Sequence, residues 1–206
     1  INSNRFSKIL EELEKKNLDI LFTKFDSFKD NKSRGSRHIN YNWLTHRVLN
    51  GDSKEILVRF VSPVGRFIRR NYIKENKLFF EKQKHLNDIF FAASLMLKKP
   101  SIKITDEVVY LIRESNKSLT SNVTKFSINS RLEALNRYNF LLKKNNLGYL
   151  MAPAIPHLYK LIKINIFSFF YQMLKILLSK QPVFFSYWTL YNLFLRQCSK
   201  IRIFKN

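Results

Sequence analysis

Closely spaced cations are the residues of this sequence whose types and spacing best suit a chemical task. In the stretch GRFIRRNYIKENK (65–77) these cations are Arg66, Arg69, Arg70, Lys74 and Lys77. Because residues three or four apart share one face of a helix, the cations would form a continuous stripe on a helix. Within the stripe no glutamate stands four residues before a lysine or arginine to pair with it. Guanidinium groups match phosphate oxygens, so the stripe predicts contact with phosphate; the alternative is a solvated helix face.

Three smaller basic clusters extend this pattern. They are Arg34 and Arg37 within SRGSRH (33–38), then Lys98, Lys99 and Lys103, and then Lys143 and Lys144. Short segments of glycine, serine and arginine can follow an RNA backbone and become ordered on binding, although a plain flexible loop is an equal alternative. Lysines near the end of a helix also complement its dipole, which suffices to explain the last pair.

The sequence lacks the familiar catalytic and metal-binding patterns. Its four glycines are scattered, so neither GxxxxGK[ST] nor GxGxxG occurs. Its single cysteine, Cys198, excludes a cysteine-based zinc site. The four histidines lie far apart, and with only 15 acidic residues a general acid–base pair is not expected. We therefore expect a protein that is not an enzyme and that uses no metal or cofactor.

The chain is strongly basic, and the imbalance grows toward its C-terminus. It carries 37 lysines and arginines against 15 acidic residues, a net charge of +22, and no acidic residue follows Glu133. It is also 45% hydrophobic and 15% aromatic, which predicts a packed core rather than disorder. Such a charge excess repels itself unless a polyanion neutralises it. The two common polyanions are nucleic acid and anionic lipid.

The spacing of apolar residues, the capping signals and the helix breakers predict that the elements carrying these cations are mainly helices. The predicted helices are 6–28, 41–49, 66–99, 106–116, 131–145, 156–180 and a last apolar one after Pro182, and a short strand is predicted at 101–104. Asn50-Gly51 predicts a tight turn before a second element that reaches residue 61. Thr105 is the expected cap of 106–116, and Ser130 with Glu133 the expected capping box of 131–145, which Gly148 would terminate.

This pattern predicts a mostly α protein: a helical bundle-like domain with at most one short β-hairpin, and with basic extensions. Three segments are expected. Residues 1–38 form an N-terminal helix and basic linker, residues 39–148 a basic helical domain, and residues 149–206 an apolar, basic pair of helices.

The most apolar run, IKINIFSFFYQMLKILL (162–178), raises the question of a membrane. Lys163 and Lys175 interrupt it, and the cost of a charge near the bilayer centre offsets the gain from its apolar residues, so spanning is about neutral in free energy. Ser168, Gln172, Lys175 and Ser179 would share one helical face. We interpret the run as a helix buried on most sides, with that polar stripe turned to water or phosphate; insertion into lipid is the alternative.

Three stretches resemble the family of the seventh small-subunit ribosomal protein. They are LNDIFFAASLMLKKPSIKI (86–104), SRLEALNRYNFLLKKN (130–145) and WLTHRVLNG (43–51). The resemblance implies a largely helical protein that binds rRNA in the head of the small subunit, near the exit-site tRNA. It also implies rRNA contacts by Arg66, Arg69, Arg70, Lys98, Lys99, Arg131 and Arg137. The family's Gly-Lys-Lys stands here as Gly51, Asp52 and Ser53, and its Arg-Arg-x-Gly-Gly arm is absent between 105 and 125.

The sequence therefore leads to three hypotheses. Abundant Phe, Ile, Asn and Lys with only four Gly indicate an AT-biased genome, such as that of an organelle, an AT-rich parasite or a large virus. The first hypothesis is a structural rRNA-binding protein of a mitochondrial ribosome, located in the matrix, with rRNA and neighbouring ribosomal proteins as partners. The second is an accessory subunit of a mitochondrial inner-membrane respiratory complex, with residues 157–195 in or on lipid. The third is a viral nucleic-acid-binding protein.

Overall fold

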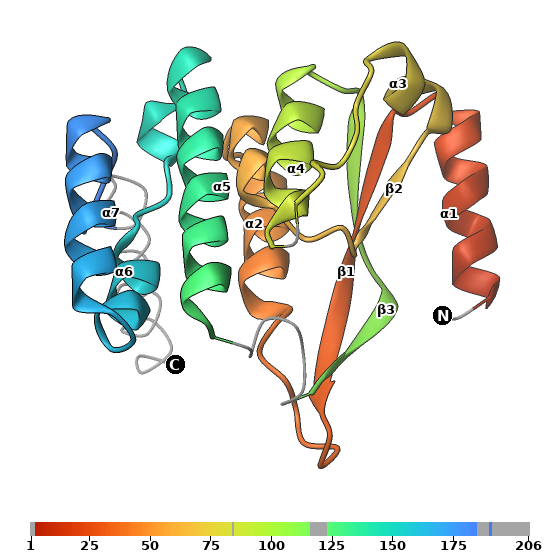
Figure 1. The fold of residues 1–206 in the computed structure, drawn as a ribbon. Coiled ribbons are helices and arrows are strands. Elements are labelled where there is room, and N and C mark those ends of the chain that lie inside the picture. The colour runs from red at the N-terminus through yellow and green to blue at the C-terminus, as the bar shows by residue number, and fades with distance from the viewer. Residues whose placement is uncertain (1–2, 84, 116–122, 185–189, 191–206) are drawn as a thin grey trace, which may run out of the picture. The chain divides into compact units, whose positions relative to one another are not determined.

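The structure, a computed structural model, describes residues 3–83, 85–115, 123–184 and 190. The chain divides into two compact units, one formed by 1–82 with 87–122 and the other by 83–86 with 123–206. Each unit is described by itself below, with the labels of Figure 1. The predicted last helix after Pro182 and Cys198 fall almost entirely outside the described residues.

A three-stranded sheet forms the centre of the first unit. Its order is β2 (Arg66–Ile68), β1 (Ile20–Lys29), β3 (Ile102–Glu114), with β1 antiparallel to β2 and parallel to β3. The register places Ile20 opposite both Ile68 and Ile102. Ile20, Leu21, Phe22 and Phe25 are completely buried. The strand is apolar on both sides because it is central in the sheet and covered on both faces.

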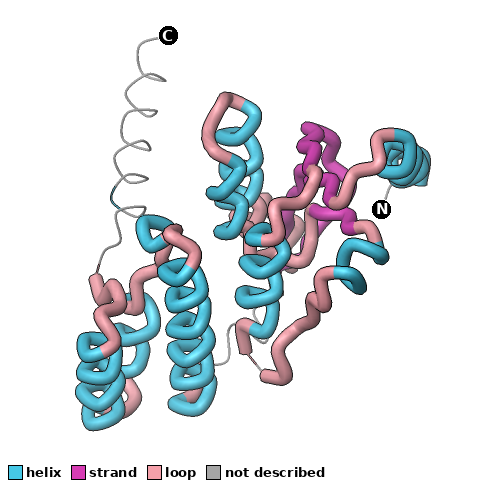
Figure 2. The backbone as a smooth tube through the Cα atoms, turned by 90° about the horizontal axis from the view of Figure 1, so that it is seen from above, coloured by secondary structure: helices cyan, strands magenta, loops and turns pink. Residues whose placement is uncertain are grey.

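Helices cover both faces of this sheet. On one face α1 (Ser3–Lys15) packs Ile9 against Leu21 and Val109. On the other face Phe22 makes an edge-on contact with Phe60, with 5.1 Å between ring centroids. Phe60 follows the 3-10 helix η1 (Lys54–Arg59), which packs with α2 (Ile39–Leu49) and α4 (Asn87–Leu97). The view from above shows the strands between α1 and the α2–α4 side (Figure 2).

The predicted fold class is therefore wrong. The described residues form a mix of helices with a three-stranded mixed sheet, not a helical bundle with at most one hairpin. The predicted helix 6–28 ends at Lys15, because Asn17 takes a left-handed conformation (φ 48°) and the apolar run that follows is a buried strand. The short strand predicted at 101–104 is confirmed, but it continues through 106–114, where a helix was predicted.

The predicted helix 66–99 is also interrupted. Arg66–Ile68 form β2, α3 (Arg70–Glu75) is short, and α4 begins only at Asn87. Gly65 precedes the strand with φ 84°, and a Cβ at this position would lie 2.6 Å from the Phe25 ring. The backbone N–H of Thr23 donates to the Gly65 carbonyl at 2.9 Å. A chain held this close to β1 continues as a paired strand and cannot start a helix at 66.

The second unit contains the long α5 (Lys125–Lys144), the short 3-10 helix η2 (Gly148–Leu150), α6 (Ile155–Ile162) and α7 (Ile166–Leu178). The capping box of α5 is made by Thr124 and Ser127, not by Ser130 and Glu133. After α5 the left-handed residue is Asn146 (φ 60°) rather than the predicted Gly148.

The apolar segment of the second unit is two helices rather than one. α6 begins with Pro156 in its first turn, as predicted, but ends at Ile162. The Asn165 side chain then caps α7 by accepting from the Ser168 N–H at 2.7 Å. Among the described residues no helix has the length and apolarity needed to cross a membrane.

Candidate nucleic-acid interface

The predicted stripe of five cations does not exist as one helical face. Arg66 lies on β2 and Arg69 precedes α3, so only Arg70 and Lys74 belong to a helix. The Arg66 side chain is buried beside the Phe60 ring, 5.7 Å from its centroid, and burial lowers its pKa to about 10. A buried guanidinium cannot reach an external phosphate, so we exclude Arg66 from the interface.

Asp19 instead brings two basic segments together. Its carboxylate accepts hydrogen bonds from the backbone N–H and the hydroxyl of Ser101, both at 2.8 Å, and it forms an ion pair with Arg69. Its backbone carbonyl accepts from the Arg69 N–H at 2.9 Å, and its N–H donates to the Ser101 carbonyl at 3.0 Å. Burial alone would raise the pKa of Asp19, but the bonds from Ser101 and Arg69 outweigh it and lower the pKa. We call this arrangement the Asp19 junction.

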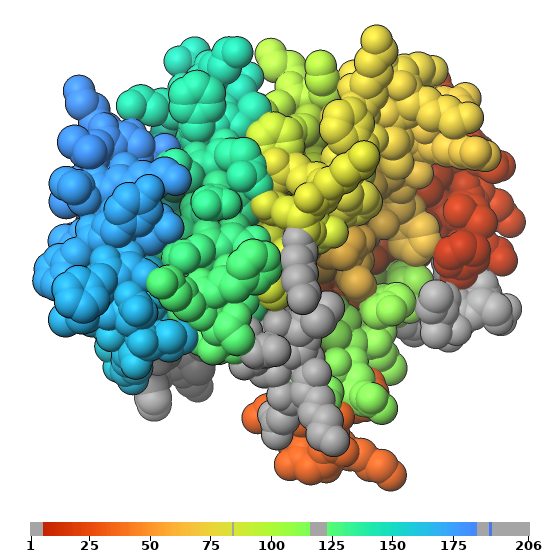
Figure 3. Space-filling view, viewed as in Figure 1, coloured from red at the N-terminus to blue at the C-terminus, as the bar shows by residue number. Residues whose placement is uncertain are grey.

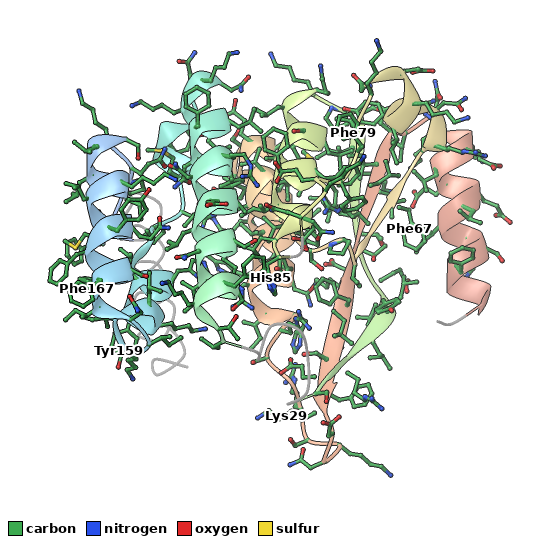
Figure 4. All side chains as sticks on the ribbon, in the orientation of Figure 1. Lys29, Phe67, Phe79, His85, Tyr159 and Phe167 are labelled. Carbon is green, nitrogen blue, oxygen red and sulfur yellow. The ribbon has the colours of Figure 1, made fainter. Side chains whose placement is uncertain are left out.

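The junction places exposed cations from distant parts of the sequence at one end of the sheet. Residues after Ile68 and residues before Ile102 both leave the sheet where β1 begins, because Ile20 pairs with both. We call the resulting group the junction surface, which consists of Arg70, Lys74, Lys77, Lys98 and Lys99. All five are exposed, and nitrogen-tipped side chains project beyond α3 and the end of α4 in Figure 4. Several phosphates can be contacted by such a group.

Two other predicted cations at this end are engaged within the chain. The guanidinium of Arg69 bonds to Asn17 as well as to Asp19. Lys103 forms an ion pair with Glu12, and the hydrogen bonds from Lys103 and Lys16 lower the pKa of Glu12. Both residues therefore hold the fold at the junction, and the exposed five are the groups available to a ligand.

A second basic group lies at the opposite end of β1, near Lys29 (Figure 4). It contains the predicted Arg34 and Arg37, together with Lys29, Lys32 and Arg113, which the sequence reasoning missed. Arg113 is opposite Phe28 across a parallel pairing. No local sequence signal reveals that proximity, because it depends on the register of strands far apart in the chain.

The loop that carries Arg34 and Arg37 is tied down rather than a free linker. The Glu114 carboxylate accepts from the backbone N–H of Ser36 at 2.8 Å and of Arg37 at 2.6 Å. A hydrogen bond with Ser27 and those backbone bonds lower the pKa of Glu114. Gly35 passes so close to Ser27 that a Cβ would collide with its hydroxyl. The loop therefore presents its arginines from a fixed backbone.

A cavity of about 370 Å³ lies beside this loop in the first unit. Its walls include Arg37, Tyr41, Ser62, Asp88 and the strand residues 110–113. Desolvation raises the pKa of both Tyr41 and Asp88. Aromatic rings, arginine and hydrogen-bonding groups are the side chains that hold an unstacked RNA base, so the cavity has the chemistry to accept one nucleotide.

The remaining predicted cations lie on α5 in the second unit. Arg131 is buried, whereas Arg137 is exposed and its guanidinium bonds to Gln83. Lys143 and Lys144 are exposed in the last turn, where they complement the helix dipole. In the part of the chain that the structure describes, no group of three histidine, cysteine or acidic residues could hold a metal ion.

No protein-family model matches the chain, and a search of curated proteins finds no significant match. The resemblance of residues 43–51, 86–104 and 130–145 to a ribosomal protein family therefore stays a prediction.

Proposed function

We propose that this chain is a structural rRNA-binding protein of an organellar, mitochondrial ribosome, in the small subunit. The observation that carries the proposal is the junction surface, in which five exposed cations from two distant segments meet at one end of the sheet. A net charge of +22 is consistent with a polyanionic partner.

In this proposal the protein works by neutralising phosphate rather than by catalysis. The junction surface would contact backbone phosphates, which position a protein on RNA without reading its sequence. Arg34 and Arg37 would contact further phosphates at the other end of β1, where hydrogen bonds to Glu114 fix the backbone of their loop. The nearby cavity would hold a single unstacked nucleotide and add selectivity for unpaired RNA. Neighbouring ribosomal proteins would be its other partners.

Salt dependence of RNA binding is the direct test. Removing one cation that touches a phosphate makes the slope of log affinity against log salt shallower by about 0.7 for single-stranded RNA. Replacing all five junction-surface cations by glutamine should therefore flatten the slope by about 3.5. A matched control is Lys16→Gln, because Lys16 is exposed but already paired with Glu12 at 3.1 Å. The quintuple variant keeping the wild-type slope would refute the assignment of these residues.

Association with ribosomes tests the cellular role. The native protein should co-sediment with the small ribosomal subunit of its organelle and leave that fraction after RNase treatment. Retention in carbonate-washed membranes, with none in the ribosomal fraction, would instead place it among subunits of a membrane complex. These two fractions separate the first hypothesis from the second.

A further inference from the structure

The outer face of α7 is apolar, and none of the residues that the structure describes covers it. Its exposed residues lie along one side of the helix and are Ile166, Phe167, Phe170, Tyr171, Leu174, Lys175, Leu177 and Leu178. Phe167 is 82% exposed and Leu178 is 75% exposed, whereas the polar Gln172 is buried on the inner side. The helix is therefore not buried on most sides as expected, and the expected polar stripe is divided, with Gln172 buried and Lys175 exposed. Because α7 is apolar around most of its circumference, its outer face requires an apolar partner.

α6 continues this surface and adds aromatic and basic groups. Tyr159 and Ile162 are exposed on α6, and Tyr159 and Phe167 project outward in Figure 4. Lys163 lies over the Tyr159 ring, with its Nζ 4.4 Å from the centroid. Figure 3 shows aromatic rings of the blue helices open on the face drawn there. A tyrosine ring with a lysine beside it combines an apolar body with a polar tip.

The charges around the apolar face all have one sign. Lys160, Lys163, Lys175 and Lys180 are exposed on or beside α6 and α7, and no acidic residue occurs in the sequence after Glu133. At 13 residues α7 is about 20 Å long, shorter than the ~30 Å hydrocarbon core of a bilayer. An apolar face with basic borders on a helix of this length suits the plane of a membrane interface.

We propose that α6 and α7 bind the surface of an anionic membrane. The apolar face of α7 enters the boundary between headgroups and acyl chains, and the flanking lysines contact lipid phosphates. A lipid surface supplies apolar chains and negative phosphates together, whereas a protein partner would need an acidic rim around an apolar patch. The exposed Tyr159 and Tyr171 match the amphipathic rings found at membrane interfaces. This binding is independent of the junction surface and adds a membrane contact to an RNA-binding protein.

The test is flotation of the full chain with vesicles. Binding should be strong to vesicles of phosphatidylcholine with phosphatidylglycerol and weak to pure phosphatidylcholine vesicles. The variant Phe167→Ser/Leu174→Ser/Leu178→Ser should bind the anionic vesicles more weakly by a factor of about ten or more, with unchanged circular dichroism. Phe79→Ser is the matched control, because Phe79 is 75% exposed but lies in the other unit.

Several outcomes would overturn the proposal. It fails if the full chain does not float with anionic vesicles, or if the triple variant floats as well as wild type. It also fails if the wild-type chain does not bind vesicles and sediments as a dimer while the triple variant sediments as a monomer. A second copy of the chain would then cover the apolar face. RNA affinity of the triple variant should equal that of wild type, so failure here is distinguishable from failure of the RNA-binding proposal.

Discussion

Replacing Lys77 and Lys99 by glycine should stabilise the protein while weakening its binding to RNA. Both lysines follow the end of a helix in the left-handed region, with φ of 50° and 53°. Their N–H groups donate back to the carbonyls of Lys74 and Met96, at 3.1 and 3.0 Å. This conformation costs a residue with a Cβ about 1–2 kcal/mol, and glycine avoids that cost.

The stability gain can be worked out from two opposing terms. Glycine removes the conformational cost but loses about 0.5–1 kcal/mol of additional chain entropy on folding. With the middle of each range, the net gain is about 0.75 kcal/mol for each site, or about 1.5 kcal/mol for the double variant. The same double variant removes two of the cations proposed to contact phosphate and should flatten the salt slope by about 1.4. Stability and affinity thus move in opposite directions.

Urea unfolding and RNA binding measured at several salt concentrations make up the assay. Lys77→Gln/Lys99→Gln removes the same charges but keeps the strained backbone, so it should lose the same RNA affinity without gaining stability. Lys180→Gly is a second control, because Lys180 is left-handed (φ 52°) but belongs to the other unit. It should gain stability and keep the wild-type salt slope. A glycine double variant that is destabilised, or that keeps the wild-type slope, would refute the reasoning.

Three further predictions concern the folds of the two units. Gly35→Ala should lower the midpoint of urea unfolding, because its Cβ would collide with the Ser27 hydroxyl and would displace the loop; an unchanged midpoint would contradict the close approach. Asn139→Ala should cost about 2–4 kcal/mol by urea unfolding, because it removes two 2.8 Å hydrogen bonds to the backbone of Ala152; a cost below about 1 kcal/mol would show that water replaces them. Desolvation lowers the pKa of His157 to about 4, so the folded state binds fewer protons than the unfolded state between pH 6.5 and 4. Stability should therefore fall by up to about 3 kcal/mol as pH drops through that window, and His157→Gln should remove this part of the pH dependence.

Local signals in the sequence predicted the ends of some elements and the exposed cations. Pro156 marked the start of α6, and the strand at 101–104 followed from its alternating pattern. The strand at Ile20 was missed because its apolar residues also fit the 3.6-residue spacing of the preceding helix. Short apolar runs do not distinguish a buried strand from a helix by periodicity alone.

The spatial grouping of the cations could not be predicted because it depends on distant strand pairing. Arg70 and Lys99 meet at one end of the sheet only because Ile20 pairs with both Ile68 and Ile102. Burial of Arg66 likewise follows from its place on β2, whereas helical spacing placed it on an exposed stripe. The outward apolar face of α7 was not predicted, since periodicity identifies two faces of a helix but does not say which one is covered.

The Asp19 junction also has a consequence for how the protein folds. Its hydrogen bonds join Asp19 to Arg69, 50 positions away, and to Ser101, 82 positions away. The parallel pairing of β1 with β3 begins with Ile20 and Ile102, which are as far apart in the chain as Asp19 and Ser101. Contacts between such distant residues form slowly, because a long loop must close before they contribute any stability. During synthesis the hydrogen bonds between Asp19 and Ser101 cannot form until Ser101 has emerged from the ribosome that synthesises the chain. We therefore expect the junction surface to be among the last parts of the first unit to form, so that any ligand of this surface binds only after the sheet is complete.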